Sequence, residues 1–206
     1  MISHEFDEEY YKDGIRSGRS LYENYRWLPQ VSLPMANAIK EIYGYKIVLD
    51  YGCAMGFLVH ALKLLNVIAY GYDTSDYAID NCKPEVKEHL FKRKEDIPKN
   101  VNLVIVKDVF EHIPYDQIDD EIRWISSICS DMMCIVPFGS DGKYRIHEYT
   151  FDRSHLIKED EEWWSKKFIA NGFFVDKFYH EYKGIKENWT DHNKFGNGIF
   201  LLKKGA

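Results

Sequence analysis

Alternating strand and helix patterns dominate the chain from Lys46 onward. Several short apolar runs have the composition of buried strands, among them KIVLD, VIAYGYD, VNLVIVKD and MMCIVPF. The stretches between them, such as FLVHALKLL, have helical periodicity. Strands that are apolar on both faces and separated by helices are typical of a parallel sheet covered on both sides. The sequence therefore predicts a doubly wound α/β fold.

The last third of the chain is expected to add one helix and two strands. Gly172 marks the expected end of the helix. The helix carries an apolar stripe formed by Trp164, Phe168 and Ile169. Two apolar strands follow, within 173–182 and 198–204. With these strands the sequence predicts a sheet of about seven.

The size of the chain favours a single domain, because 206 residues lie within the usual range of one compact unit. A hydrophobic fraction of 45% is too high for a disordered chain. Within 1–206 we expect a core at 46–206 and an N-terminal, tyrosine-rich extension at 1–45. The aromatic side chains of the extension suit core packing, a lid over a binding site or a partner surface. Tyr25 and Trp27 are its candidate substrate-binding residues.

Charge and cysteine content narrow the partners and the compartment. The net charge is −6 and the basic residues are dispersed, which disfavours binding to long nucleic acid. No stretch approaches 18 uninterrupted apolar residues, and the N-terminus is polar and acidic, so neither a membrane span nor secretion is expected. The four cysteines form no CxxC pair, which favours a reduced, cytoplasmic setting.

A glycine-containing loop follows the first strand of the core, in KIVLDYGCAMGFLVHAL. The strand ends in Asp50, and Gly52 and Gly56 precede an amphipathic helix. Glycines permit a tight turn and close backbone approach, while the N-terminus of the helix offers free N–H groups to a ligand. Asp73 ends the next strand, 21 residues beyond Gly52, where a carboxylate can meet ribose hydroxyls. These features predict a nucleotide-type site and leave open a nicotinamide dinucleotide, whose loop has the spacing GxGxxG.

Three motifs in order resemble the class I S-adenosylmethionine-dependent methyltransferases of the small-molecule type. The spacing from Asp50 to Gly56 is Asp-x-Gly-x-x-x-Gly and matches the first motif of that family. NLVIVKDVFEHIP matches a fourth strand followed by an Asp-x-x-Glu-His-Ile pattern, and CIVPFG resembles the fifth strand and its loop. The resemblance covers about 46–202. It implies a Rossmann-like fold with an antiparallel last strand and S-adenosyl-L-methionine as cofactor.

The resemblance also implies roles for individual residues. Ala54 stands where the family often has glycine, and alanine occurs there in relatives. The cofactor's methionine half is lined by Asp50, Gly52, Cys53 and Gly56. Asp73 contacts the ribose, and Lys107 and Asp108 approach the methionine side and the transferable methyl group. For the adenine amino group the third strand offers Glu95 or Asp96, and we favour Asp96.

His112 follows the fourth strand, on the rim where substrates bind in open α/β sheets. An alcohol nucleophile needs a base, and histidine suits that role near neutral pH. In the resembling family this histidine is often near the substrate but also serves to hydrogen-bond the loop. His112 is therefore a candidate catalytic residue, with a structural role as the alternative.

The segment RIHEYTFDRSH follows the fifth strand and is expected on the same rim. One interpretation is proton transfer to and from a polyhydroxy substrate, with His147 or His155 as base and Asp152 orienting it. Glu148 and Tyr149 are then candidate substrate contacts. A metal site is a second interpretation, but this spacing is no recognised zinc or iron signature, so no metal is assigned. Capping of the next helix by Asp152 or Ser154 is the third.

The segment 182–198 joins the last two strands and is rich in turn residues. It is expected to be a hairpin connection, and Trp189, Asp191 and His192 within it are further candidates for the site.

These observations predict a methyltransferase that acts on a small acceptor. Loops rich in Tyr, Trp, Asn, Asp and His favour O-methylation of a hydroxylated metabolite such as a sugar or nucleotide-sugar. One alternative is another small N- or O-nucleophile, on a lipid, quinone or peptide. The other is a non-catalytic, cofactor-binding partner protein.

Overall fold

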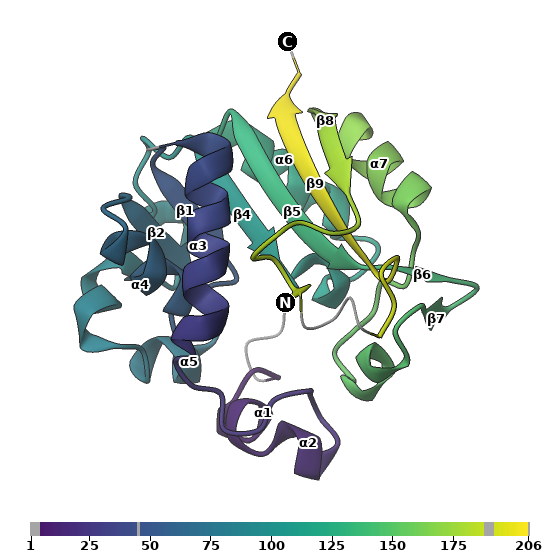
Figure 1. The fold of residues 1–206 in the computed structure, drawn as a ribbon, viewed down its shortest axis with the longest axis horizontal. Helices are drawn as coiled ribbons and strands as arrows, with labels where there is room; N and C mark the ends of the chain where they lie inside the picture. The colour runs from purple at the N-terminus through teal and green to yellow at the C-terminus, as the bar shows by residue number, and fades with distance from the viewer. Residues whose placement is uncertain (1–4, 45, 188–191, 206) are drawn as a thin grey trace.

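A seven-stranded sheet in the order β3-β2-β1-β4-β5-β9-β8 organises the computed structural model, which describes residues 5–44, 46–187 and 192–205 (Figure 1). The strands are β1 (Val48–Tyr51), β2 (Ala69–Tyr72), β3 (Leu90–Phe91), β4 (Leu103–Lys107), β5 (Asp131–Pro137), β8 (Phe173–Tyr179) and β9 (Asn197–Lys204). β1 to β5 are mutually parallel, and β9 runs antiparallel to both β5 and β8. The predicted doubly wound sheet with an antiparallel last strand is confirmed.

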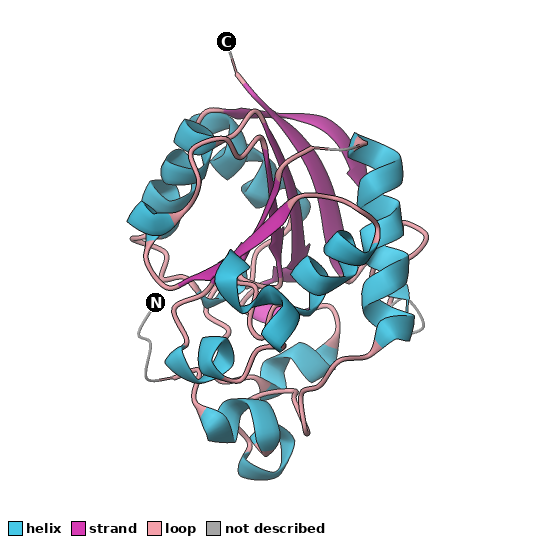
Figure 2. Ribbon diagram, turned by 90° about the vertical axis from the view of Figure 1, so that its left-hand side faces the viewer, coloured by secondary structure: helices cyan, strands magenta, loops and turns pink. Residues whose placement is uncertain are grey.

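Helices cover both faces of this sheet, as Figure 2 shows from the side. The α-helices of the core are α3 (Pro29–Tyr43), α4 (Phe57–Leu64), α5 (Asp76–Asp80), α6 (Ile118–Ile128) and α7 (Glu161–Ala170). Short 3-10 helices are η1 (Pro84–His89), η2 (Lys94–Asp96), η3 (Phe110–His112) and η4 (His147–Phe151), and a small hairpin is formed by β6 (Gly139–Ser140) and β7 (Lys143–Tyr144). Successive strand residues point to opposite faces. In β4, Val104 and Val106 accordingly join the core of α6 and α7, whereas Leu103 and Ile105 join that of α3 and α4.

Helix α7 follows the prediction with one correction. Trp164 and Phe168 are fully buried, but Ile169 is 62% exposed. The reason is geometric, because residues four apart share a helix face whereas residue 169 lies on the other side of the helix. The helix is capped by Asp160, whose side chain accepts from the Trp163 N–H, so neither Asp152 nor Ser154 caps it. Gly172, at a φ of +96°, follows the helix end as predicted.

The part of the N-terminal extension that precedes α3 lies across the carboxyl ends of the parallel strands, whereas α3 packs on a face of the sheet. Its two short helices, α1 (Glu8–Lys12) and α2 (Gly14–Ser17), are drawn below the strand arrowheads in Figure 1. Tyr10 and Tyr11 are buried, and the ring of Tyr25 stacks on Phe57 of α4 at 5.1 Å. These aromatic rings of the extension therefore pack inward, against the rim of the sheet.

In the described part of the chain, every helix is too short or too polar to cross a lipid bilayer.

Candidate active site

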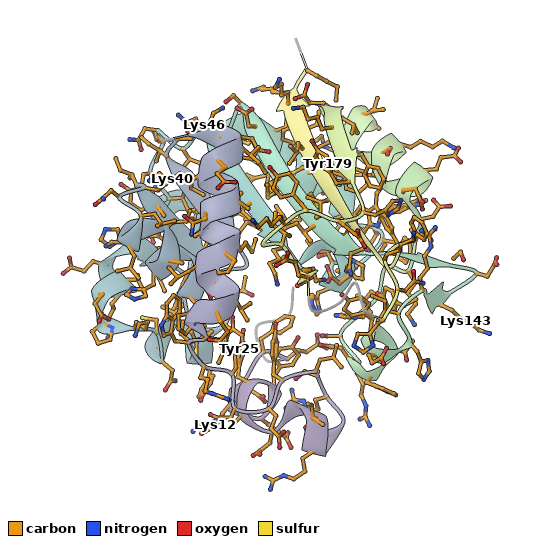
Figure 3. The ribbon with its side chains drawn as sticks, in the orientation of Figure 1. Lys12, Tyr25, Lys40, Lys46, Lys143 and Tyr179 are labelled. Atoms are coloured by element: carbon orange, nitrogen blue, oxygen red, sulfur yellow. The ribbon has the colours of Figure 1, made fainter. Side chains whose placement is uncertain are left out.

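A cavity of about 450 Å³ lies between the carboxyl edge of the sheet and the N-terminal extension. The sheet side is lined by residues at the ends of β1, β2 and β4, namely Asp50, Gly52, Cys53, Asp73, Lys107 and Asp108. The opposite wall consists largely of rings, from Phe6, Tyr10, Tyr11, Tyr22 and Tyr25. Tyr25, labelled in Figure 3, lies between the start of α3 and the N-terminal helices. The cavity thus has a polar floor and an aromatic cover.

The loop after β1 owes its shape to residues with left-handed backbone. Gly52 has a φ of +79°, Ala54 of +47° and Gly56 of +72°. Such values are costly for most L-residues, which accounts for the two glycines. Gly52 also lies against Val109, so a Cβ at this position would meet the valine methyl groups. Gly56 begins α4 and does not line the cavity.

Asp73 holds the loop in this conformation while facing the cavity. Its two carboxylate oxygens accept from the backbone N–H groups of Ala54 at 2.7 Å and of Ser75 at 2.8 Å. The carboxylate joins the turn after β1 to the turn after β2. The backbone of Thr74 also hydrogen-bonds this carboxylate, and because an ionised carboxylate has about four acceptor sites, about one remains for a ligand hydroxyl group.

Asp50 is buried at the floor of the cavity. Burial raises its pKa to about 7, although the positive charge of Lys107 acts in the opposite direction. A carboxyl group of this kind changes charge near neutral pH. It can therefore respond to a positively charged ligand.

Two lysines flank Asp108, which follows β4 at the floor of the same cavity. The Lys107 ammonium lies 2.5 Å from one carboxylate oxygen, and the Lys186 ammonium lies 2.5 Å from the other. Burial alone would raise the pKa of Asp108, but the two lysines outweigh it and hold that pKa below its usual range. Lys186 also donates to Asn197 at 2.8 Å.

Lys186 was not among the residues that we expected in the site. It comes from the segment between β8 and β9, which returns to the carboxyl rim because β9 runs antiparallel to β5. The sequence pointed to this segment, but to other residues in it. Of those, Trp189 and Asp191 lie outside the described residues, and His192 is exposed and pairs with Glu148 at 3.2 Å.

His112 lies at the edge of the cavity. Its Nδ1 is 2.9 Å from Ser154 Oγ, and its ring contacts that of His155, with the ring centroids 4.6 Å apart. Burial lowers the pKa of His112, and the carboxylates of Asp152 and Asp108 only partly offset that effect. The neutral imidazole, which can accept a proton, is therefore favoured at pH 7.

The segment RIHEYTFDRSH forms η4 and a turn, and the lining of the cavity contains none of its residues. His147 is exposed on the outside of η4. Tyr149 is buried and donates from its hydroxyl to Asn197. Asp152 reaches the cavity wall indirectly, because it accepts from the hydroxyl of Tyr10 at 2.9 Å.

The remaining predicted residues lie apart from the cavity lining. Asp96 pairs with Arg93 on the surface. Trp27 packs against Phe57 and His60 over helix α4. The structure thus brings together most of the residues predicted for the cofactor, with His112 and Tyr25 beside them. The predicted residues outside the cavity lining are Trp27, Gly56, Asp96, His147, Glu148, Tyr149, Asp152 and His155.

Solved structures with a similar fold include several methyltransferases. One is the Burkholderia thailandensis 1,6-didemethyltoxoflavin-N1-methyltransferase with bound 1,6-didemethyltoxoflavin and S-adenosylhomocysteine, with a TM-score of 0.66 and 14% identity over 96% of this chain and 85% of that one. Another is the magnesium protoporphyrin IX methyltransferase of Synechocystis with bound S-adenosylhomocysteine, with a TM-score of 0.64 and 13% identity over 99% and 98% of the two chains.

A third is an S-adenosylmethionine-dependent methyltransferase from Archaeoglobus fulgidus, with a TM-score of 0.62 and 17% identity over 82% of this chain and 93% of that one. No protein-family model and no curated protein sequence matches the chain. Sequence identities this low show a similar fold and nothing further. The chain has the fold of the class I S-adenosylmethionine-dependent methyltransferases.

Proposed function

We propose that the chain transfers the methyl group of S-adenosylmethionine to a small acceptor bound in the cavity. The convergence of Asp50, Gly52 and Asp73 with Lys107 and Asp108 on one cavity carries this proposal. Its volume of about 450 Å³ is in the range of small-molecule sites, roughly 300–1,000 Å³. In this proposal Asp73 accepts hydrogen bonds from the ribose hydroxyls of the cofactor. Asp50 and Asp108 lie next to its charged methionine end.

Methyl transfer requires little of the protein beyond position and charge. An electron pair of the acceptor attacks the methyl carbon as the carbon–sulfur bond breaks, and the sulfur keeps that bonding pair. Holding two reactants in line can contribute about 7–11 kcal/mol to the lowering of the barrier. His112 is placed to take the acceptor's proton, since it lines the cavity and is neutral at pH 7.

The N-terminal extension is, in this proposal, a lid over the reacting groups. The hydroxyl of Tyr10 donates to Asp152, and the hydroxyl of Ser75 donates to the backbone carbonyl of Phe6 at 2.5 Å. The turn after η4 and the turn after β2 therefore both hold the N-terminal extension in place. An aromatic cover excludes water from the transfer step. Because these rings face the cavity, they favour a lid over a partner surface.

A hydroxylated metabolite such as a sugar or nucleotide-sugar is the acceptor that we propose. Tyrosines supply stacking surfaces with hydroxyl tips, which suit a polyhydroxy compound. Another N- or O-nucleophile of similar size would use the same cofactor residues, and acceptor screening separates the two.

The four cysteines are free thiols, which supports a reducing, cytoplasmic setting.

Cofactor choice is tested by calorimetric titration with S-adenosylmethionine and, separately, with NAD. We expect micromolar binding of S-adenosylmethionine and none of NAD. Asp73→Asn should weaken binding about 10- to 100-fold, the size expected when a hydrogen bond to a charged group is lost. Asp80→Asn is the matched control, because Asp80 pairs with Lys92 on the surface. Binding of NAD alone, or of neither ligand, would contradict the proposal.

Cofactor affinity should depend on pH through Asp50. The ionised carboxylate attracts the positively charged cofactor, and it forms only as the pH rises toward the pKa of about 7. We therefore expect the dissociation constant to fall up to about tenfold per pH unit below pH 7 and to level off above it. Calorimetry between about pH 5.5 and about pH 7.5 measures this slope, and Asp50→Asn should flatten it. The same slope in the variant would assign the dependence to another group.

A further inference from the structure

Glu111 is a carboxyl group without a hydrogen-bond partner in the described interior of the protein. It is fully buried, and neither of its carboxylate oxygens has a hydrogen-bond partner among the described residues. Buried polar groups are nearly always hydrogen-bonded, and a buried charge needs a partner or a metal ion. The side chain therefore calls for a ligand that the protein itself does not supply.

Two histidines face Glu111. One ligand atom from each of Glu111, His112 and His155 can be chosen so that all three lie within 4.8 Å of one another. Glu111 and His112 belong to the turn after β4, and His155 follows η4 after β5. Side chains from two separate loops thus converge at one point, which the spacing within RIHEYTFDRSH alone does not predict.

Hydrogen bonds through Nδ1 orient both imidazole rings, and Nε2 of His155 lies 3.9 Å from a carboxylate oxygen of Asp152, beyond hydrogen-bond distance. The Nδ1 of His155 lies 2.9 Å from the backbone oxygen of Tyr149, so it carries the proton. Ser154 donates to Asp152 at 2.5 Å, and its oxygen therefore accepts from Nδ1 of His112 at 2.9 Å. In each ring the lone pair is left on Nε2. Metal-binding histidines characteristically donate their other ring N–H in this way.

We propose that Glu111, His112 and His155 bind a divalent transition-metal ion of the zinc class. Two imidazoles and one carboxylate are a common ligand set for such ions at catalytic sites, where a further position stays open. Bonds of about 2.1 Å place tetrahedral ligand atoms about 3.4 Å apart, so the ligand atoms, now within 4.8 Å of one another, must approach by up to about 1.4 Å on binding. Of the three residues, His112 also lines the cavity, which places the trio beside it.

The role of the ion rests on the proposed function. A hydroxyl oxygen of the acceptor would occupy the open position, and the ion would lower the pKa of that hydroxyl so that it releases its proton to water as the acceptor enters, before the aromatic cover excludes water. The oxygen lone pair then forms the bond to the methyl carbon, and the carbon–sulfur bond breaks toward sulfur. Metal-assisted O-methylation narrows the acceptor to compounds with an oxygen donor. His112 then holds the ion and does not itself take the proton.

Titration of the metal-stripped, full-length protein with Co²⁺ tests the site, because the visible absorption of Co²⁺ reports its ligands. We expect saturable binding of one equivalent, displaced by Zn²⁺. Glu111→Gln and His155→Asn should each weaken the affinity at least about hundredfold, because each removes one of three ligands. His147→Asn is the matched control and should leave the affinity unchanged, since His147 is exposed and lies outside the trio.

Thermal unfolding guards against loss of fold in the variants. Zn²⁺ should raise the melting temperature of the wild-type protein and of His147→Asn, but not that of a folded Glu111→Gln. Absence of a saturable Co²⁺ signal in the wild type, or equal affinity in Glu111→Gln, would overturn the metal site. S-adenosylmethionine binding measured on the same samples separates the two proposals. Cofactor binding without metal binding refutes only the metal site, and metal binding without cofactor binding refutes only the methyltransferase.

Discussion

Gly52→Ala is expected to lower the free energy of unfolding by about 2–5 kcal/mol and to abolish measurable binding of S-adenosylmethionine. Two costs add at this position. The φ of +79° is unfavourable for alanine by about 1–2 kcal/mol, and the new Cβ would overlap the methyl groups of Val109, which forces a shift of the loop at about 1–3 kcal/mol. The displaced loop would carry Asp50 and Cys53 away from the cofactor.

Gly142→Ala separates the two costs. Gly142 has a φ of +73°, but a Cβ there would have no heavy atom within 4 Å. Its cost should be only the conformational one, about 1–2 kcal/mol, with cofactor affinity unchanged. Urea unfolding followed by circular dichroism and calorimetric titration measure both quantities. If the two variants lost equal stability and both bound the cofactor, the contact between Val109 and a Cβ at position 52 would contribute neither to the loss of stability nor to the loss of cofactor binding.

The architecture was predictable because it depends on local patterns. The apolar runs around Val48 and Leu103 are short and bounded by turns, and amphipathic stretches separate them, so each element follows from its own few residues. Parallel strands bring their carboxyl ends to one edge. Asp50 and Asp73 each end a strand, so the sequence alone suffices to place them at one site. Both line the cavity.

Convergence of side chains from distant loops was not predictable from local patterns. Lys186 lies 78 positions from Asp108 in the chain, and only the antiparallel pairing of β9 brings them together. The same holds for Glu111 and His155. Between His147 and His155 the sequence offers no preference, but η4 directs the first outward and the following turn directs the second inward.

The packing of the aromatic N-terminal extension could not be predicted from local sequence patterns either. Its composition suits packing, a lid or a partner surface equally well, because all three use rings. The deciding features are contacts with other segments, such as the bond between Tyr10 and Asp152 and the stacking of Tyr25 on Phe57. The sequence therefore predicts which strand ends meet at the cavity better than it predicts how the N-terminal extension packs there.

Asp108→Asn is expected to lower the free energy of unfolding by about 3 kcal/mol at neutral pH, the low end for breaking a buried ion pair. The substitution leaves the ammonium groups of Lys107 and Lys186 without their shared counter-charge, and Lys186 is only 5% exposed. Asparagine tolerates the φ of +54° at this position, so the backbone should not contribute. Asp96→Asn, which breaks the exposed pair with Arg93, should change stability little.

The pH dependence of the stability difference between wild type and Asp108→Asn tests whether the charge of Asp108 causes that difference. The two lysines hold the pKa of Asp108 below its value in the unfolded chain, which is about 3.9. For a carboxyl group shifted in this direction, the stabilisation is present above the unfolded pKa and is lost as the pH falls below it. The difference between wild type and Asp108→Asn should therefore be constant from neutral pH down to about pH 5 and shrink below about pH 4. Urea unfolding at each pH measures it. A difference that persisted undiminished in acid would mean that packing or hydrogen bonding, and not the charge shared between Lys107 and Lys186, makes Asp108 important.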